Sequence, residues 1–147
     1  MPGVPPLRPV AGIAARRSTI TAPVHRHTIP MTPTALTLHQ ASRVLEIAFA
    51  DGRTFRLPYE FLRVYSPSAE VRGHGPGQET LQVGKREVGI EKFEPVGHYA
   101  IQPTFTDGHA SGIYSWDYLH DLGSRQDELW QRYLDRLAQA GASRDPK

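Results

Sequence analysis

Residues 104–119, TFTDGHASGIYSWDYL, combine a hairpin signal with the start of a helix. The Asp107-Gly108 pair predicts a tight type I′ turn, because both central residues of that turn need a positive φ. Phe105 and Ile113 stand on either side of the turn as expected strand residues. Residues 115–120 then show the pattern of the first turns of a helix. The stretch predicts a strand, a turn, a second strand and a helix in succession.

The same order of signals occurs earlier, in residues 47–62, IAFADGRTFRLPYEFL. In both stretches a phenylalanine stands two positions before the Asp-Gly pair, and a leucine follows at helix distance. The chain is therefore predicted to use one strand–turn–strand–helix unit twice. The two phenylalanines and two leucines are expected to point into one shared interior: Phe49, Leu62, Phe105 and Leu119.

The remaining segments predict an α+β domain, with a mainly antiparallel sheet, two short helices and a C-terminal amphipathic helix. Pro58 suits a helix start and Ser66-Pro67 a helix end, which bounds the first short helix at 59–64. Ser124 is expected to cap the C-terminal helix, whose apolar face continues until Gly141 stops it. Strands are expected at 36–38, 43–49, 54–57, 88–93 and 99–105, with an interruption at 94–97.

Composition and charge exclude several classes of protein. The chain has 147 residues, no cysteine and no apolar run of the roughly 18 residues that span a bilayer. Residues 1–30 hold four arginines, no acidic residue and six of the thirteen prolines. Without those four arginines, 13 basic side chains face 15 acidic ones in the rest of the chain. The basic character therefore belongs to the first thirty residues, which argues against a nucleic-acid partner for the domain.

The chain is predicted to consist of a disordered leader, residues 1–30, and a folded domain, residues 31–147. Proline-rich composition without periodicity favours disorder in the leader. A non-functional leader upstream of a start at Met31 and an arginine-rich transit sequence both stay open. The absence of cysteine fits a cytoplasmic location. We expect no membrane association.

Residues 34 to about 144 resemble a small bacterial domain of unknown function that is similar to the N-terminal domain of γ-butyrobetaine hydroxylase. The resemblance covers nearly the whole chain beyond the leader. It rests on these segments: Leu45-Glu-Ile, Asp51-Gly52, Leu57-Pro58, 61–71, 73–78, 84–86, 94–97 and 107–119.

The resemblance implies a degenerate metal site. In the eukaryotic hydroxylases of this kind, zinc is held by three cysteines and one histidine. Carried over, those positions fall near Ser66, Ser68 and Val71 and at His109. Serine is a poor zinc ligand and valine is none, so a tetrahedral structural site is not expected. We expect His109 to bond a nearby backbone group; the alternative is a metal-binding module with an altered site around His109.

Other chemistry has weak support in the sequence. The glycine loop 73–78 lacks the strand-to-helix context and the Gly-Lys-Ser/Thr of a phosphate loop. No nucleophile elbow and no Cys–His pair occurs, and the iron triad of the 2-oxoglutarate oxygenases is missing. We therefore expect a non-enzymatic protein without a cofactor. An enzyme with an unrecognised site near His74 and His109 is a weaker alternative.

The best functional hint is a set of aromatic and basic residues of the kind that protein interfaces favour. The resemblance adds that the domain helps assemble the dimer of carnitine-pathway hydroxylases and is fused to P-loop ATPases of iron–sulfur cluster assembly. We expect an accessory domain that binds an unidentified protein partner, with a possible homodimer and a link to iron–sulfur maturation. The expected interface residues are Arg63, Arg72, His74, Lys85, Arg86, Trp116 and Tyr118.

Overall fold

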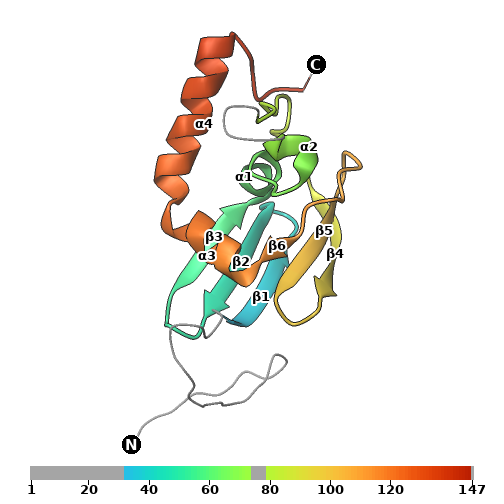
Figure 1. Cartoon of the computed structure of the whole chain (residues 1–147), viewed down its shortest axis with the longest axis vertical. Helices are drawn as coiled ribbons and strands as arrows, with labels where there is room; N and C mark the ends of the chain where they lie inside the picture. Colours follow the sequence, from blue (N-terminus) through green and yellow to red (C-terminus); the bar gives the residue numbers. More distant parts are fainter. Residues whose placement is uncertain (1–31, 74–78, 147) are drawn as a thin grey trace, which may run out of the picture.

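The computed structural model describes residues 32–73 and 79–146, which form six strands and four helices (Figure 1). The predicted leader and the glycine-loop residue His74 lie outside the described residues. The strands are β1 Pro33–His39, β2 Val44–Phe49, β3 Thr54–Pro58, β4 Ile90–Val96, β5 Ala100–Phe105 and β6 Tyr114–Ser115. The helices are α1 Tyr59–Val64, α2 Ala69–Arg72, α3 Trp116–Ser124 and α4 Gln126–Ala140.

The α+β class is confirmed, and the strands form two antiparallel three-stranded sheets with the orders β1-β2-β3 and β4-β5-β6. In β2 every second side chain, Leu45, Ile47 and Phe49, is buried, as the alternation of its sequence requires. β4 pairs only with β5, so Pro95 lies on an edge strand, where a missing N–H is tolerated. The strand therefore continues through the predicted interruption to Val96, and Gly97 turns the chain with a φ of 56°.

Both Asp-Gly turns differ from the predicted type I′ geometry. Among the described residues, Arg43 is the only non-glycine with a positive φ, so neither turn aspartate has one. The positive φ falls on the glycines alone, at 89° for Gly52 and 92° for Gly108. In each turn the glycine N–H donates to the carbonyl of the preceding phenylalanine, at 3.0 Å. This is the pattern of a longer hairpin loop that ends in a left-handed glycine.

The second unit has a much shorter return strand than its sequence predicts. β6 has two residues, and Tyr114 pairs with Ile101. Ile113 was expected in the strand but is 44% exposed and precedes it. The segment before β6 instead packs against the end of α1, where a side chain on Gly112 would place its Cβ 2.4 Å from the Ser66 hydroxyl.

The core is shared by both units, as predicted. Phe49, Leu62, Phe105 and Leu119 all belong to one buried cluster, and none is more than 3% exposed. Both sheets and α1 and α3 contribute to this cluster. Figure 1 shows α3 crossing in front of the first sheet, with α1, α2 and α4 gathered at the other end of the molecule.

The C-terminal helix begins later than predicted, because Ser124 is the last residue of α3 rather than the cap of α4. Its predicted end is confirmed, since Gly141 follows in a left-handed conformation. The chain then returns to residues 84–86, where the carbonyls of Ser143 and Arg144 accept from the N–H groups of Gly84 and Arg86. The Arg144 guanidinium binds both carboxylate oxygens of the buried Glu60, at 2.8 and 2.7 Å.

Candidate functional site

The four positions that correspond to the zinc ligands of the eukaryotic hydroxylases lie close together in the structure. Ser66, Ser68, Val71 and His109 are all buried. His109 Nε2 lies 2.9 Å from Ser66 Oγ and 3.4 Å from Ser68 Oγ. His109 Nδ1 lies 3.2 Å from a carboxylate oxygen of Glu70. The partners of the imidazole are therefore side chains, and the expectation of a backbone partner is wrong.

The surroundings of the His109 imidazole favour its neutral form. Burial lowers its pKa below the usual value, and the nearby positive charge of Arg63 acts in the same direction, against the Glu70 and Asp107 carboxylates. A neutral ring with its proton on Nδ1 donates to Glu70 and accepts the Ser66 hydroxyl at Nε2. The arrangement satisfies both ring nitrogens.

These residues do not fit a metal ion. A structural zinc site takes thiolate, imidazole or carboxylate ligands, and three of the four positions here are serine or valine. Within residues 32–73 and 79–146, no group of three or more His, Asp or Glu side chains could hold a metal. His120 pairs with Asp51, 2.9 Å away, and does not join His109.

Glu70, His109 and Ser66 are connected in the order of an acid–base–nucleophile triad. Whether they could act as one depends on whether a substrate can reach the Ser66 hydroxyl. Ser66 is only 1% exposed. The backbone of Gly112 packs against its hydroxyl, since a Cβ on this glycine would lie 2.4 Å from the hydroxyl oxygen. Ser66 borders a hollow between the helices, but its 1% exposure leaves the hydroxyl little access to a substrate carbonyl, which favours a structural role for the three residues.

Two of the predicted interface residues belong to a partly buried ion-pair network instead. Arg63 Nε and Lys85 Nζ both contact Asp107 Oδ2, at 3.0 and 2.7 Å. Arg63 also donates to the Gln82 side chain at 2.9 Å. Burial raises the Asp107 pKa, but hydrogen bonds from Lys85 and the His109 N–H and the Arg63 charge outweigh it and lower the pKa to about 2.

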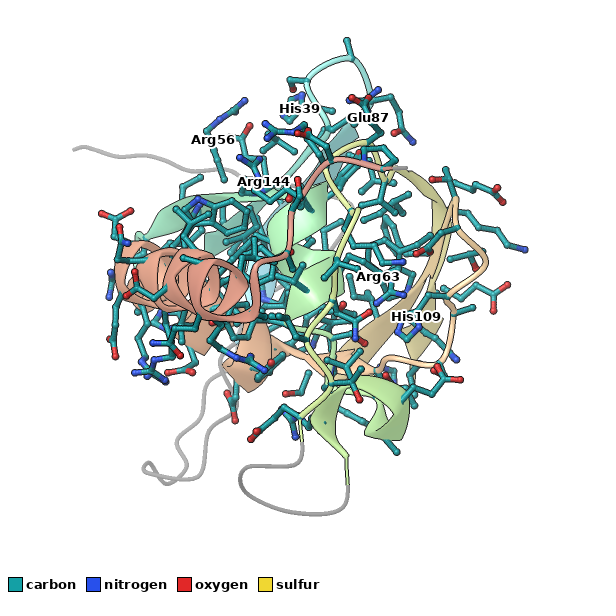
Figure 2. The ribbon with its side chains drawn as sticks, turned by 90° about the horizontal axis from the view of Figure 1, so that it is seen from above. His39, Arg56, Arg63, Glu87, His109 and Arg144 are labelled. Carbon is teal, nitrogen blue, oxygen red and sulfur yellow. The ribbon has the colours of Figure 1, made fainter. Side chains whose placement is uncertain are left out.

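Figure 2 shows Arg63 close to His109, inside the side-chain layer. Arg63 is 7% exposed, so its predicted place on an interface rim is wrong. Lys85 is half-buried and engaged by Asp107, and the exposed Arg86 pairs with Asp145. Trp116 donates its indole N–H to the His98 carbonyl at 2.8 Å and packs against the core.

The other two predicted interface residues, Arg72 and Tyr118, meet in a hollow of about 560 Å³. Its walls come from the four helices, from residues 65–66 and 73 after α1 and α2, and from residues 79–80, and we call it the helix hollow. The Arg72 guanidinium lies 5.0 Å from the centre of the Tyr118 ring, at cation–π distance. The Tyr118 hydroxyl is fixed by donation to the Tyr65 carbonyl at 2.6 Å. Arg136 of α4 also lines the hollow.

Arginine side chains of α2 and α4 bring positive charge to the helix hollow. Burial raises the pKa of the Tyr65 hydroxyl, and Arg132 and Arg136 oppose this rise, which places their charges close to it. Arg132 is neutralised by Glu128, 3.0 Å away. In the described part of the chain neither Arg72 nor Arg136 pairs with a carboxylate, and Glu79 is the acidic residue that lines the hollow.

Sequence reasoning missed Tyr65, Glu79 and Arg136 as members of this site. The spacing of Arg132 and Arg136, one helical turn apart, was the signal that could have indicated a basic face of α4. Which neighbours that face meets depends on how α4 packs, so no local pattern reveals it.

Comparison with known proteins places the chain in a family. Residues 36–120 match the family model described as gamma-butyrobetaine hydroxylase-like, N-terminal. The chain belongs to this family. The match runs from within β1 to within α3 and so contains both repeated units, whereas the whole of α4 lies beyond it.

Solved structures support the membership of this gamma-butyrobetaine hydroxylase-like N-terminal domain. Two proteins studied by NMR in solution are 50% and 48% identical, each with a TM-score of 0.70. The alignments cover 80% and 84% of this chain and 93% and 92% of the relatives. A crystallised DUF971-family protein of unknown function from Acidithiobacillus ferrooxidans is 40% identical, with a TM-score of 0.54 over 63% of this chain and 92% of its own.

No curated protein matches the chain. Within residues 32–73 and 79–146, no helix has the length and apolar character needed to cross a membrane.

Proposed function

We propose that this gamma-butyrobetaine hydroxylase-like N-terminal domain is a non-enzymatic accessory domain that binds another protein in the cytoplasm. The observation that carries the proposal is the helix hollow, where Arg72 stacks on Tyr118 and Arg136 lies nearby without a carboxylate partner among the described residues. Tyrosine and arginine are enriched among the residues that dominate binding at protein interfaces. Such a surface suits a protein partner.

The state of the titratable cluster supports a binding role over a catalytic one. Both nitrogens of His109 are occupied by Glu70 and Ser66, and the serine is enclosed. Asp107 is held between Arg63 and Lys85. Each of these groups has its hydrogen-bonding capacity used inside the protein, which is how residues that stabilise a fold are arranged.

The partner class comes from the resemblance rather than from geometry. Related domains are fused to P-loop ATPases of iron–sulfur cluster assembly, so such an ATPase is the first partner to test. A second copy of the chain is the other. We expect neither nucleic acid nor membrane among the partners, since the basic charge is concentrated in residues 1–30.

Quantitative capture tests the proposal. Full-length wild type and the variants Arg72→Ala, Arg136→Ala and Arg56→Ala are immobilised at equal density, and bound proteins from native lysate are quantified. Arg56 is the matched control, because it lies on β3 and pairs with Glu46, outside the hollow. We expect either hollow variant to lose the main partner at least about tenfold, the scale of one charge-assisted contact. Equal capture by all four proteins would contradict the proposal.

A further inference from the structure

We infer that the helix hollow binds a single carboxylate side chain flanked by an apolar residue, presented by an acidic peptide segment of the partner. This inference rests on the proposed protein-binding function and adds the chemistry of the bound segment.

The first support is the distribution of charge. Every described arginine other than Arg53, Arg72 and Arg136 forms an ion pair with a carboxylate. Arg53 stacks over Phe55 on the first hairpin, 5.0 Å from the ring centre. The other two line the same hollow, although they come from different helices, α2 and α4. Two arginines that line one concave surface and form no ion pair with a described carboxylate are complementary to a carboxylate from outside.

The second support concerns how much negative charge fits. Glu79 also lines the hollow and is exposed. Its carboxylate offsets part of the positive potential and repels a run of acidic residues. The balance of two guanidinium groups against one carboxylate therefore selects an isolated Asp or Glu rather than a polyacidic tail.

The third support is the apolar part of the walls. The half-buried ring of Tyr118 provides apolar surface in the hollow, and Val64 and Val71 also line it but are each only 6% exposed. An aliphatic or aromatic side chain next to the carboxylate would cover this surface. The site thus matches an acidic residue with an apolar neighbour.

The shape favours a peptide over a small molecule. Arg72, Glu79 and Thr80, which line the hollow, are all exposed to solvent. Pockets for small molecules bury most of the ligand surface. A segment that is anchored by the rest of a partner protein does not need that enclosure.

Peptide selection tests the inference. Randomised octapeptides displayed on phage are selected on the full-length protein at low ionic strength, with depletion on the Arg72→Gln/Arg136→Gln double variant. We expect the enriched pool to contain one Asp or Glu next to an apolar residue. A synthetic peptide from that pool should bind at least about tenfold more weakly to either single variant, and the same loss should follow from its own Glu→Gln or Asp→Asn change. Binding should also weaken as salt is added.

The controls separate the possible failures. Arg56→Gln should bind the peptide like wild type, and all variants should melt within about two degrees of it, because neither hollow arginine forms an ion pair with a carboxylate of the described residues. No enrichment, enrichment without an acidic residue, or binding that ignores both arginines overturns the inference. Competition by free glutarate as strong as that of the peptide also overturns it, since the hollow would then take a small dicarboxylate.

The outcome also distinguishes this inference from the proposed function. If the hollow variants lose protein capture while the selected peptides carry no acid, protein binding stands and the carboxylate inference fails. If acidic peptides bind the hollow but protein capture is unaffected by the variants, the inference stands and the proposed function fails.

Discussion

The two strand–turn–strand–helix units share their turns but differ in the path of the chain after each turn. In each turn the phenylalanine N–H donates to the carbonyl of the residue after glycine, at 2.8 Å for Phe49 and 2.9 Å for Phe105. In each, the aspartate Oδ1 accepts an N–H two residues on. After the first turn the chain enters β3 directly. After the second turn it first passes the end of α1, where His109 contacts the Ser66 hydroxyl. The same turn is thus followed by a regular strand in the first unit and, in the second, by an irregular segment, residues 109–113, that the His109 side chain holds against the end of α1.

The second oxygen of each turn aspartate connects the two units reciprocally. Asp51 of the first turn contacts His120 in the helix of the second unit, and Asp107 of the second turn contacts Arg63 in the helix of the first. His120 and Arg63 are each the fifth residue of their helix. The contacts are equivalent in place but unequal in burial, since the Arg63 side chain is 8% exposed and that of His120 19%.

The largest expected effect tests whether the two turns support one core equally. Phe105→Ala should lower the free energy of unfolding by about 3–5 kcal/mol, because it removes a large buried side chain. Phe49→Ala should cost a similar amount. Urea denaturation of both variants measures this. A loss below about 1 kcal/mol in either would show that its unit does not share the core.

The second prediction separates the two reciprocal contacts. Asp107→Asn keeps the turn hydrogen bond but leaves the buried Arg63 guanidinium without an anion, so we expect a loss of about 2–4 kcal/mol. Asp51→Asn should leave the unfolding free energy unchanged within error, because its contact is more exposed. Denaturant unfolding of the two variants in parallel gives the difference. Equal losses would contradict the assignment of unequal burial.

The third prediction concerns the irregular segment, residues 109–113, that His109 holds against the end of α1. His109→Ala should cost about 1–3 kcal/mol, since it leaves the buried Ser66 hydroxyl without its main partner. Capture of the partner should be unchanged, because His109 does not line the helix hollow and its partner Ser66, which does, is only 1% exposed. The purified wild type should hold no stoichiometric zinc by elemental analysis. A folded variant that loses the partner or a bound metal would show a functional role for this histidine.

The smallest effect is a pH dependence with two windows. The His109 pKa is lower in the folded state, so its neutral form stabilises the fold above about pH 6.5, and this contribution is lost as the pH falls below that value. The Asp107 pKa is about 2 when folded, so its stabilisation is complete above about pH 4 and is lost as the pH falls toward 2. Melting temperatures measured across pH 2–8 should depend less on pH just below about pH 6.5 for His109→Gln. For Asp107→Asn they should depend less on pH between about pH 4 and 2.

The elements that the sequence predicts well are those set by local signals. The first helix has its predicted bounds, 59–64, because Pro58 and Ser66-Pro67 fix both ends. The turn type was wrong because an Asp-Gly pair suits two loop lengths, and the hydrogen bonds of the flanking phenylalanine choose between them. The one-turn helix α2 has too few residues to show a period.

The site was less accessible to sequence reasoning, because tertiary contacts decide it. Arg63 and Arg72 look alike in the sequence, yet one is buried against Asp107 and the other lies over Tyr118. Arg136 becomes relevant only through the packing of α4. Residue type alone identified arginines and tyrosines as candidates for an interface. Only the structure shows which of them stabilise the fold and which line the hollow.

The contact between Glu60 and Arg144 has a consequence for how the protein is made. Glu60 is buried, and 84 positions separate it from the arginine that neutralises it. On the ribosome, the first hairpin and α1 are complete long before that arginine is synthesised. Until then, burying the Glu60 carboxylate would carry a full desolvation cost. We therefore expect α1 to pack stably against the core only after Arg144 has been synthesised, so that the last step of folding depends on the C-terminal segment.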